Sequence, residues 1–284
     1  MAKSPSHELG EKIGNFLENA MKEPIKDLCK KHSVYFDCYG KRATRKTQKV
    51  TWEDINGSKH DLDYVIERNG DENNLGNPIA FIELAWRRYT KHSKNKVQEI
   101  AGAILPISEK YSEYSPFKGA ILSGVFTTPS INQLKNQGFN VLYIPYEEVI
   151  KSFKKYGVDL SFDENTSEKE LKKIIRQLNK TKNIKDIEQD FILSNKGDID
   201  VFMSSLESTL KRNIDYVFIL PLHGKETKFN NIEDALLFLD GYSTLPEDAS
   251  INRYIVGIRY NNGSSIDCSF NSKLEVENFL KNLS

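Results

Sequence analysis

Apolar periodicity divides the first half of the chain into helices and strands. Residues 7–31 predict an amphipathic helix in spite of Pro24, because apolar side chains recur there every three or four positions. A second stripe predicts a helix from about Asn95 to Tyr111, and both stripes should cover a sheet. The two stripes consist of Ile13, Phe16, Leu17, Ala20, Met21, Ile25 and Leu28, and of Val97, Ile100, Ala101, Ile104 and Leu105.

Strand patterns lie between and after these helices. HDLDYVIE (60–67) alternates, a polar loop with glycines follows, and PIAFIELAW (78–86) resumes, so the two segments predict a hairpin-like pair. GAILSGVFT (119–127), SINQLKNQG (130–138) and NVLYIPY (140–146) predict a strand, helix, strand unit with parallel strands. Ser130 is the expected N-cap of that helix and Gly138 its C-cap. The pattern indicates an α/β fold in which a mixed central sheet is flanked by helices.

The pattern changes after Tyr156. Residues as far as about Asp186 are rich in lysine and glutamate and low in apolar content, which indicates exposed helices or a linker. We therefore expect one domain over 1–160 and a second over 161–284. The sequence of the second domain predicts a smaller α+β module, and it shows neither an internal repeat nor a catalytic motif. Its strand candidates are 216–222, 253–260 and 264–270, and its helix candidates are 232–242 and 273–283.

Composition narrows the class of protein. With 284 residues, of which 38% are hydrophobic and 28% charged, the chain can bury a sizeable core. The formal net charge is zero, so any basic footprint for nucleic acid must be local. Cys29, Cys38 and Cys268 show no paired C-x-x-C spacing, which argues against a disulfide framework or a structural zinc site. No apolar run resembles a signal peptide or a membrane span, so we expect a soluble cytoplasmic protein.

Acidic residues interrupt the two central strand patterns. Asp61 and Asp63 would share one face of a strand, and Glu83 stands between Ile82 and Leu84 in a strongly apolar strand. A carboxylate buried there without a partner would cost several kcal/mol, so Glu83 should be paired, bound to metal or solvated. Mg²⁺ prefers oxygen ligands, and two adjacent strands can hold such ligands rigidly.

The order of these features resembles the PD-(D/E)XK restriction-endonuclease-like nuclease superfamily. An acid opens an apolar strand, a second apolar strand carries Glu83, and a helix and the strand, helix, strand unit follow, a likeness that covers roughly 11–156. HDLDYVI followed by IAFIEL is similar to the archaeal Holliday-junction resolvases and restriction enzymes of that superfamily. The resemblance implies Mg²⁺ as the cofactor. It implies Asp63, in preference to Asp61, as the first metal ligand and Glu83 as the second. The backbone carbonyl of Leu84 would be a further ligand.

The sequence departs from that family at position 85, where the resemblance implies a lysine and the chain has Ala85. An alanine can neither stabilise a phosphate transition state nor position water, so another side chain substitutes, the domain is catalytically dead, or it was inactivated by engineering. The helix after the strand offers Lys96 and Gln98, which lie at opposite borders of the apolar stripe, whereas Glu99 should point away. We rank Lys96 first. Arg87 is a further candidate, as a phosphate clamp.

The resemblance implies a Mg²⁺-dependent endonuclease that cuts double-stranded DNA, most simply a type II restriction enzyme acting as a homodimer. Phosphate contacts are expected from the basic run after the second strand, and the C-terminal module would serve recognition or dimerisation. We expect Glu11 and Glu18 of the first helix to be solvated, although some members of the superfamily bring a helical glutamate to the metal. The residues expected to contact DNA are Arg87, Arg88, Lys91 and Lys94.

Three other functions fit the same residues. A repair or recombination nuclease acting on branched DNA or ends would carry the same motif. A non-catalytic DNA-binding protein that kept the nuclease fold would explain Ala85. An α/β domain with a buried glutamate and no role in nucleic-acid chemistry is the third.

Overall fold

The computed structural model describes residues 4–90, 93–222, 224–242 and 253–283, which form two compact units. The first unit comprises the described residues up to Lys110 and those of Pro116–Leu210, and the second comprises Tyr111–Ser115 and the described residues from Lys211 onward. Of the helices in the described part of the chain, none is both long and apolar enough to cross a membrane.

A five-stranded mixed sheet organises the first unit, in the order β1–β4–β5–β6–β7. β1 (Tyr35–Cys38), β4 (Tyr64–Arg68) and β5 (Asn77–Arg87) are antiparallel neighbours, which confirms the predicted hairpin-like pair. β5, β6 (Phe117–Gly124) and β7 (Asn140–Pro145) run parallel, which confirms the predicted parallel unit. Nine consecutive residues of β5 are buried, as expected for a strand covered on both faces.

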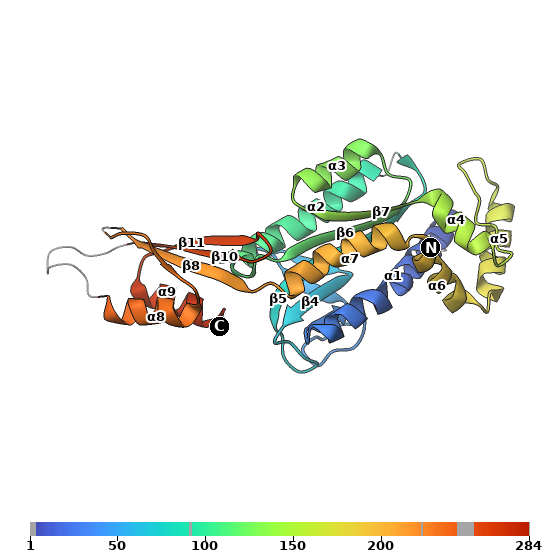
Figure 1. The fold of residues 1–284 in the computed structure, drawn as a ribbon. Coiled ribbons are helices and arrows are strands. Elements are labelled where there is room, and N and C mark those ends of the chain that lie inside the picture. Colours follow the sequence, from blue (N-terminus) through green and yellow to red (C-terminus); the bar gives the residue numbers. More distant parts are fainter. Residues whose placement is uncertain (1–3, 91–92, 223, 243–252, 284) are drawn as a thin grey trace. The chain divides into compact units, whose positions relative to one another are not determined.

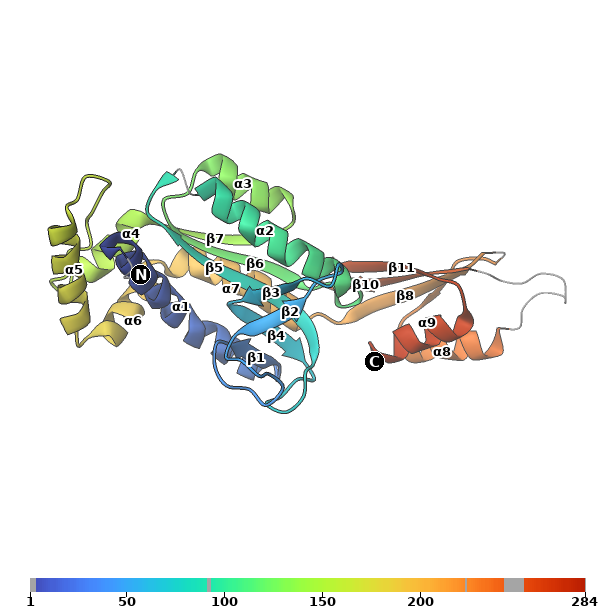
Figure 2. The same ribbon diagram turned by 180° about the vertical axis from the view of Figure 1, so that it is seen from behind.

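Helices cover both faces of this sheet (Figures 1 and 2). α2 (Ser93–Lys110) and α3 (Thr128–Asn136) lie on one face, and α1 (Pro5–Lys31) and α7 (Lys196–Leu210) lie on the other. The predicted stripes of α1 and α2 are the faces that these helices bury. The predicted N-cap of α3 was wrong, because the side chain of Thr127, three residues earlier, accepts the backbone N–H of Ser130 at 3.3 Å.

The expected domain boundary near residue 160 differs from the structure, where the first unit continues to Leu210. After α4 (Tyr146–Lys154), α5 (Glu168–Lys180) and α6 (Ile184–Ser194) join the same core as α1. Phe191 of α6 packs edge-on against Phe16 at 5.4 Å between ring centroids. The lysine-rich composition of this region led to the wrong boundary, because only a narrow stripe of each helix is buried. In α5 this stripe consists of Leu171, Ile174 and Ile175.

The chain passes between two sheets at Asp63. β2 (Val50–Glu53) and β3 (Lys59–Leu62) form a separate antiparallel pair, and β4 begins at Tyr64 in the five-stranded sheet. The expected continuous strand over 60–67 is therefore broken at Asp63, because the residues before it pair with β2 and those after it with β1 and β5.

The second unit is a small α+β module, as predicted. Its antiparallel sheet has the order β11–β10–β8–β9, and α8 (Ile232–Gly241) and α9 (Lys273–Lys281) pack on one face of it (Figure 1). The strands are β8 (Ile214–Pro221), β9 (Thr227–Phe229), β10 (Tyr254–Tyr260) and β11 (Ser265–Phe270). A 3₁₀ turn at Ser112–Tyr114 belongs to the same unit.

This module repeats one motif, contrary to the expectation of no internal repeat. β8, β9 and α8 form a hairpin followed by a helix, and β10, β11 and α9 form another. Phe229 contacts Phe238 at 5.1 Å between ring centroids, and Phe270 contacts Phe279 at the same 5.1 Å. Each helix is also capped by a side chain that accepts a backbone N–H three residues later, from Asn231 and from Ser272. The repeat lies in these equivalent positions, and the sequence between them differs.

Candidate functional site

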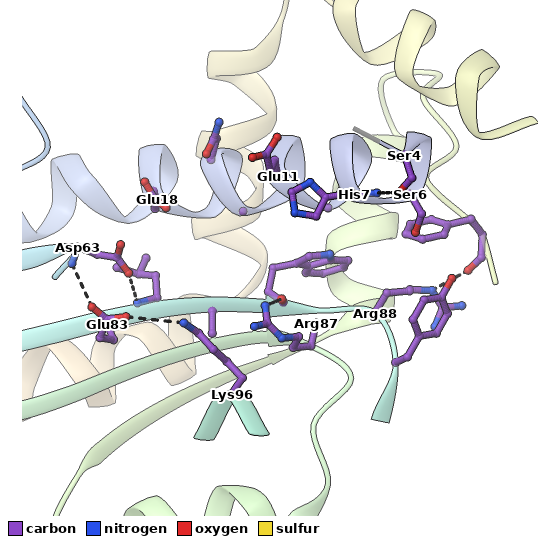
Figure 3. Close-up of a pocket in the computed structure, with 18 residues that line it drawn as sticks. Ser4, Ser6, His7, Glu11, Glu18, Asp63, Glu83, Arg87, Arg88 and Lys96 are labelled. Atoms are coloured by element: carbon purple, nitrogen blue, oxygen red, sulfur yellow. Dashed lines mark hydrogen bonds and ion pairs between the residues drawn. The ribbon is translucent and has the colours of Figure 1, made fainter. Parts of the chain in front are cut away.

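Two carboxylates meet where β4 begins beside β5. The Oδ2 of Asp63 accepts the backbone N–H of Leu84 at 2.7 Å, and the Oε1 of Glu83 accepts the backbone N–H of Asp63 at 3.3 Å. These reciprocal bonds fix both side chains to backbone atoms of neighbouring strands (Figure 3). Because N–H and C=O of a strand residue point to the same side, the carbonyl of Leu84 lies on the side where Asp63 sits.

Burial makes this pair of carboxylates electrostatically costly. Glu83 is 8% exposed. Its burial, and then the charge of Asp63, raises the pKa of Glu83 to about 8. Burial also raises the pKa of Asp63, while the N–H of Leu84 and the charge of Lys96 lower it. Two neighbouring carboxylates that stay buried in spite of desolvation and mutual repulsion are typical of a cation-binding site.

Glu18 of α1 adds a third carboxylate, which corrects the expectation that this residue is solvated. It lines the same groove as Asp63 and is half-buried, because the face of α1 that carries it turns toward β5 (Figure 3). Burial, and then the charge of Asp63, raises the pKa of Glu18 to about 7, whereas Lys22 lowers it. Glu11 lines the groove too, but its side chain is exposed, as expected.

Lys96 supplies the cation of the site. It comes from the first turns of α2, and its Nζ lies 4.0 Å from Oε2 of Glu83 and 3.6 Å from Oε2 of Glu99. Glu99, which was expected to point away from the site, contacts two of its basic residues. Besides its contact with Lys96, its carboxylate lies 3.8 Å from Nη2 of Arg87. Gln98, the other expected substitute for a lysine at position 85, is exposed and does not line the groove. Its neighbour Val97 faces the core, which turns the side chain of Gln98 away from β5.

Ala85 lies on the wall of the groove and is 3% exposed. Its methyl side chain offers the carboxylates no amine. The lysine that approaches Glu83 comes from α2 and not from β5.

Asp61 is separate from this arrangement. Its Oδ2 accepts Nζ of Lys49 at 2.6 Å, and its Oδ1 accepts the hydroxyl of Thr51 at 2.7 Å. The ion pair with Lys49 lowers the pKa of Asp61, opposite to the shift at Asp63. The prediction that Asp61 and Asp63 share a strand face was wrong, because Asp61 belongs to β3 and Asp63 lies at the break between β3 and β4.

The expected DNA-contacting residues have different surroundings. Arg87 lines the groove, although its Nη1 donates to the carbonyl of Trp86 at 2.8 Å. Arg88 has a packing role that the sequence did not indicate: its Nε donates to the carbonyl of Phe162 at 2.6 Å, and its guanidinium lies 3.9 Å from the ring centre of Tyr146. Lys94 is exposed, and Lys91 lies outside the described residues.

The groove beside these residues has a volume of about 560 Å³. Its walls are the polar face of α1 and the end of β5, and Gly10 and Gly14 of α1 leave open space where a side chain would project. Asp63, Glu83 and Lys96 lie together along it (Figure 3).

The donor set fits a hard divalent cation. The described residues hold no cluster of three or more His, Cys, Asp or Glu side chains placed to bind a metal, so a site here would rest on Asp63, Glu83 and the carbonyl of Leu84. Mg²⁺ is commonly held by one or two carboxylates while it keeps several waters, so these oxygen donors suit it. Of the ligand types that favour zinc, the groove is lined by one imidazole, that of His7 at the start of α1, and by no thiolate.

Comparisons with known proteins do not place the chain in a family. No family model matches it, and no curated protein does. Among solved structures, "Crystal Structure of Protein of Unknown Function AF1548" is 12% identical, and the match covers 57% of this chain and 97% of that one, with a TM-score of 0.29. A TM-score of this size does not define a shared fold.

Proposed function

We propose that the first unit is a Mg²⁺-dependent DNA endonuclease of the PD-(D/E)XK kind, and most simply a type II restriction enzyme that acts as a homodimer on double-stranded DNA. The observation that carries the proposal is the pairing of Asp63 with Glu83 across neighbouring strands, next to Lys96. The order of elements is consistent with it, since a helix precedes three antiparallel strands, and a helix and two parallel strands follow.

Each residue has a distinct task in this proposal. Asp63 and Glu83 would hold the metal with the carbonyl of Leu84, and bound Mg²⁺ would supply Lewis-acid activation of water and neutralise charge on the phosphate. Lys96 would donate hydrogen bonds to the attacking water or to a phosphate oxygen, in place of a lysine at position 85. Arg87 would contact a non-bridging phosphate oxygen from the groove wall.

One observation favours a second function. Ala85 removes the lysine that the resemblance implies, and a DNA-binding protein that has lost catalysis would tolerate this change. Three features support the catalytic proposal over it: the costly burial of Glu83, the nearby Asp63 and the approach of Lys96, which binding alone does not require.

Incubation of the purified chain with unmethylated phage or plasmid DNA separates the two functions. Discrete fragments that form with Mg²⁺ and disappear with chelator would support the endonuclease. Salt-dependent DNA binding without cleavage, in Mg²⁺ or Mn²⁺, would support the binding protein. Absence of both binding and cleavage would reject both proposals.

A further inference from the structure

A concentration of basic side chains lies on the other side of Asp63 from Arg87. We call it the basic strip and define it as Lys22, Lys26 and Lys30 of α1 with Lys41, Arg45, Lys46 and Lys49 from the segment between β1 and β2. Residues 41–49 hold five basic residues, counting Arg42, and no acidic one. In a chain with zero formal charge, this is a strong local excess.

The strip is continuous with the candidate site. A cavity of about 610 Å³ is lined by Glu18, Asp61 and Asp63 together with Lys22, Tyr39 and Lys49. A second cavity, of about 320 Å³, shares Lys22 and Tyr39 with it and is also lined by the strip's Lys26, Lys30, Lys41 and Arg45. On α1 the lysines follow Glu18 at intervals of four residues, about 6 Å along the helix axis for each interval, so they share one face.

Most of these charges are not neutralised within the described residues. Lys30 pairs with Asp27 at 3.0 Å, and Lys49 pairs with Asp61 at 2.6 Å. In the part of the chain that the structure describes, no carboxylate oxygen lies within 4.0 Å of the ammonium groups of the other four lysines, Lys22, Lys26, Lys41 and Lys46. These four can be partnered by an external anion.

Arg45 is the most buried member of the strip whose surroundings are described. Its side chain is 10% exposed and lines two of the cavities. Nη2 lies 3.1 Å from Oδ1 of Asp37 and bonds to the carbonyls of Cys38 and Gly40, whereas Nε and Nη1 have no acceptor among the described residues. Since Nε and Nη1 are closed to solvent, Arg45 adds positive charge next to the strip's lysines, and the exposed lysines are the groups that a phosphate can reach.

We propose that the basic strip binds the sugar–phosphate backbone of the DNA whose scissile phosphate is held at Asp63 and Glu83. This inference rests on the proposed endonuclease function. Asp63 and Glu83 offer a polyanion no attraction of their own, and the strip supplies positive charge beside them without pairing with either carboxylate. Exposed Tyr39 lies among these residues, with 65% of its surface accessible. The strip therefore takes the backbone-positioning role that Arg88, engaged with Phe162 and Tyr146, does not fill.

The test compares two triple variants with equal loss of charge. Lys26→Ala/Lys41→Ala/Lys46→Ala alters the strip, and Lys169→Ala/Lys173→Ala/Lys180→Ala removes three exposed lysines of α5. Duplex binding is measured by fluorescence anisotropy over a range of salt concentrations, with Ca²⁺ in place of Mg²⁺ to prevent cutting. We expect the strip variant to bind at least tenfold more weakly and its log–log salt slope to fall by about 2–3, while the control variant stays near wild type.

Two outcomes would overturn the inference. Equal binding by the strip variant and the control, with a wild type that cleaves DNA, would overturn the basic strip and leave the proposed function standing. A wild type that neither binds nor cleaves DNA would overturn both. Lys41→Glu/Lys46→Glu serves as a second variant, because both side chains are exposed and their replacement leaves the packing of α1 intact. It should weaken binding in the same direction.

Discussion

The Nζ of Lys96 lies 4.0 Å from Oε2 of Glu83, although Glu83 is on β5 and Lys96 is on α2. A cation at this distance can stabilise the buried carboxylate and still donate to a ligand in the groove. This geometry supports the proposal that Lys96 replaces the absent lysine at position 85.

Replacing Lys96 tests that role. We expect Lys96→Ala to lower the single-turnover cleavage rate by about 10²–10³-fold, the range for loss of one group that acts in the transition state. Gln98→Ala is the matched control on the same helix, and it should cut at the wild-type rate because its side chain is exposed. Equal cleavage rates for Lys96→Ala and Gln98→Ala would show that Lys96 has no part in the reaction.

A relocated lysine should be replaceable by one at the position that the resemblance implies. Ala85→Lys in the Lys96→Ala background should recover at least tenfold of the lost cleavage rate, because position 85 also lines the groove. The new side chain enters a buried position, so the double variant should unfold at lower denaturant. A folded double variant without any gain in rate would contradict the prediction that a lysine at position 85 can replace Lys96.

The raised pKa of Glu83 links stability to pH. This pKa is about 8 in the folded protein against 4.5 for an ordinary glutamate, so folding takes up a proton between these values. The metal-free protein should therefore lose stability as pH rises from about 4.5 to about 8. Glu83→Gln removes this penalty, and at pH 8 it should raise the free energy of unfolding by about 1–3 kcal/mol. Urea unfolding at pH 5 and pH 8 measures it, with Glu99→Gln as the exposed control. A penalty that is equal at both pH values would contradict the assignment.

Glu18 should affect the metal requirement. Its carboxylate lines the groove with Asp63, so Glu18→Gln is expected to shift the Mg²⁺ concentration for half-maximal cleavage several-fold. Glu23→Gln, which changes an exposed residue of the same helix, should not shift it. If both variants need the same Mg²⁺ concentration for half-maximal cleavage, Glu18 has no role in metal binding.

In the second unit, Gly257 and Phe218 form a close pair across β10 and β8. A Cβ at position 257 would lie 2.0 Å from Cε1 of Phe218. We expect Gly257→Ala to destabilise this unit by about 1–3 kcal/mol through overpacking. Phe218→Ala/Gly257→Ala should reverse part of the loss, and chemical denaturation of the four proteins in a double-mutant cycle would detect the coupling. Additive losses would contradict the predicted clash.

The sequence predicted those elements whose pattern is local. The stripes of α1 and α2 were recognisable because each repeats over several turns, and Glu83 stood out because its neighbours in β5 are apolar. The break at Asp63 was missed because it depends on which strands pair, and β2 is remote from β5 in the sequence. The direction of Glu18 depends on the packing of α1 against β5, which helical periodicity alone does not specify.

Composition misled the boundary prediction. α5 is so polar that it resembled a linker, although three apolar residues suffice to attach it to the core beside α1. The repeat in the second unit was missed for a related reason. Its halves share capping and aromatic positions, such as Phe238 and Phe279, but hardly any consecutive sequence. Both the attachment of α5 to the first core and the repeat in the second unit depend on tertiary packing, which the sequence pattern does not show.

Two aspartates that lie two residues apart allow the most direct test of the central claim. Asp63 faces Glu83, whereas Asp61 is bound to Lys49 and Thr51 outside the groove. Asp61→Asn and Asp63→Asn are incubated with unmethylated phage DNA and Mg²⁺ beside the wild type. The account predicts metal-dependent fragments from the wild type and from Asp61→Asn, and intact DNA from Asp63→Asn. Cleavage by Asp63→Asn at the rate of Asp61→Asn would contradict it.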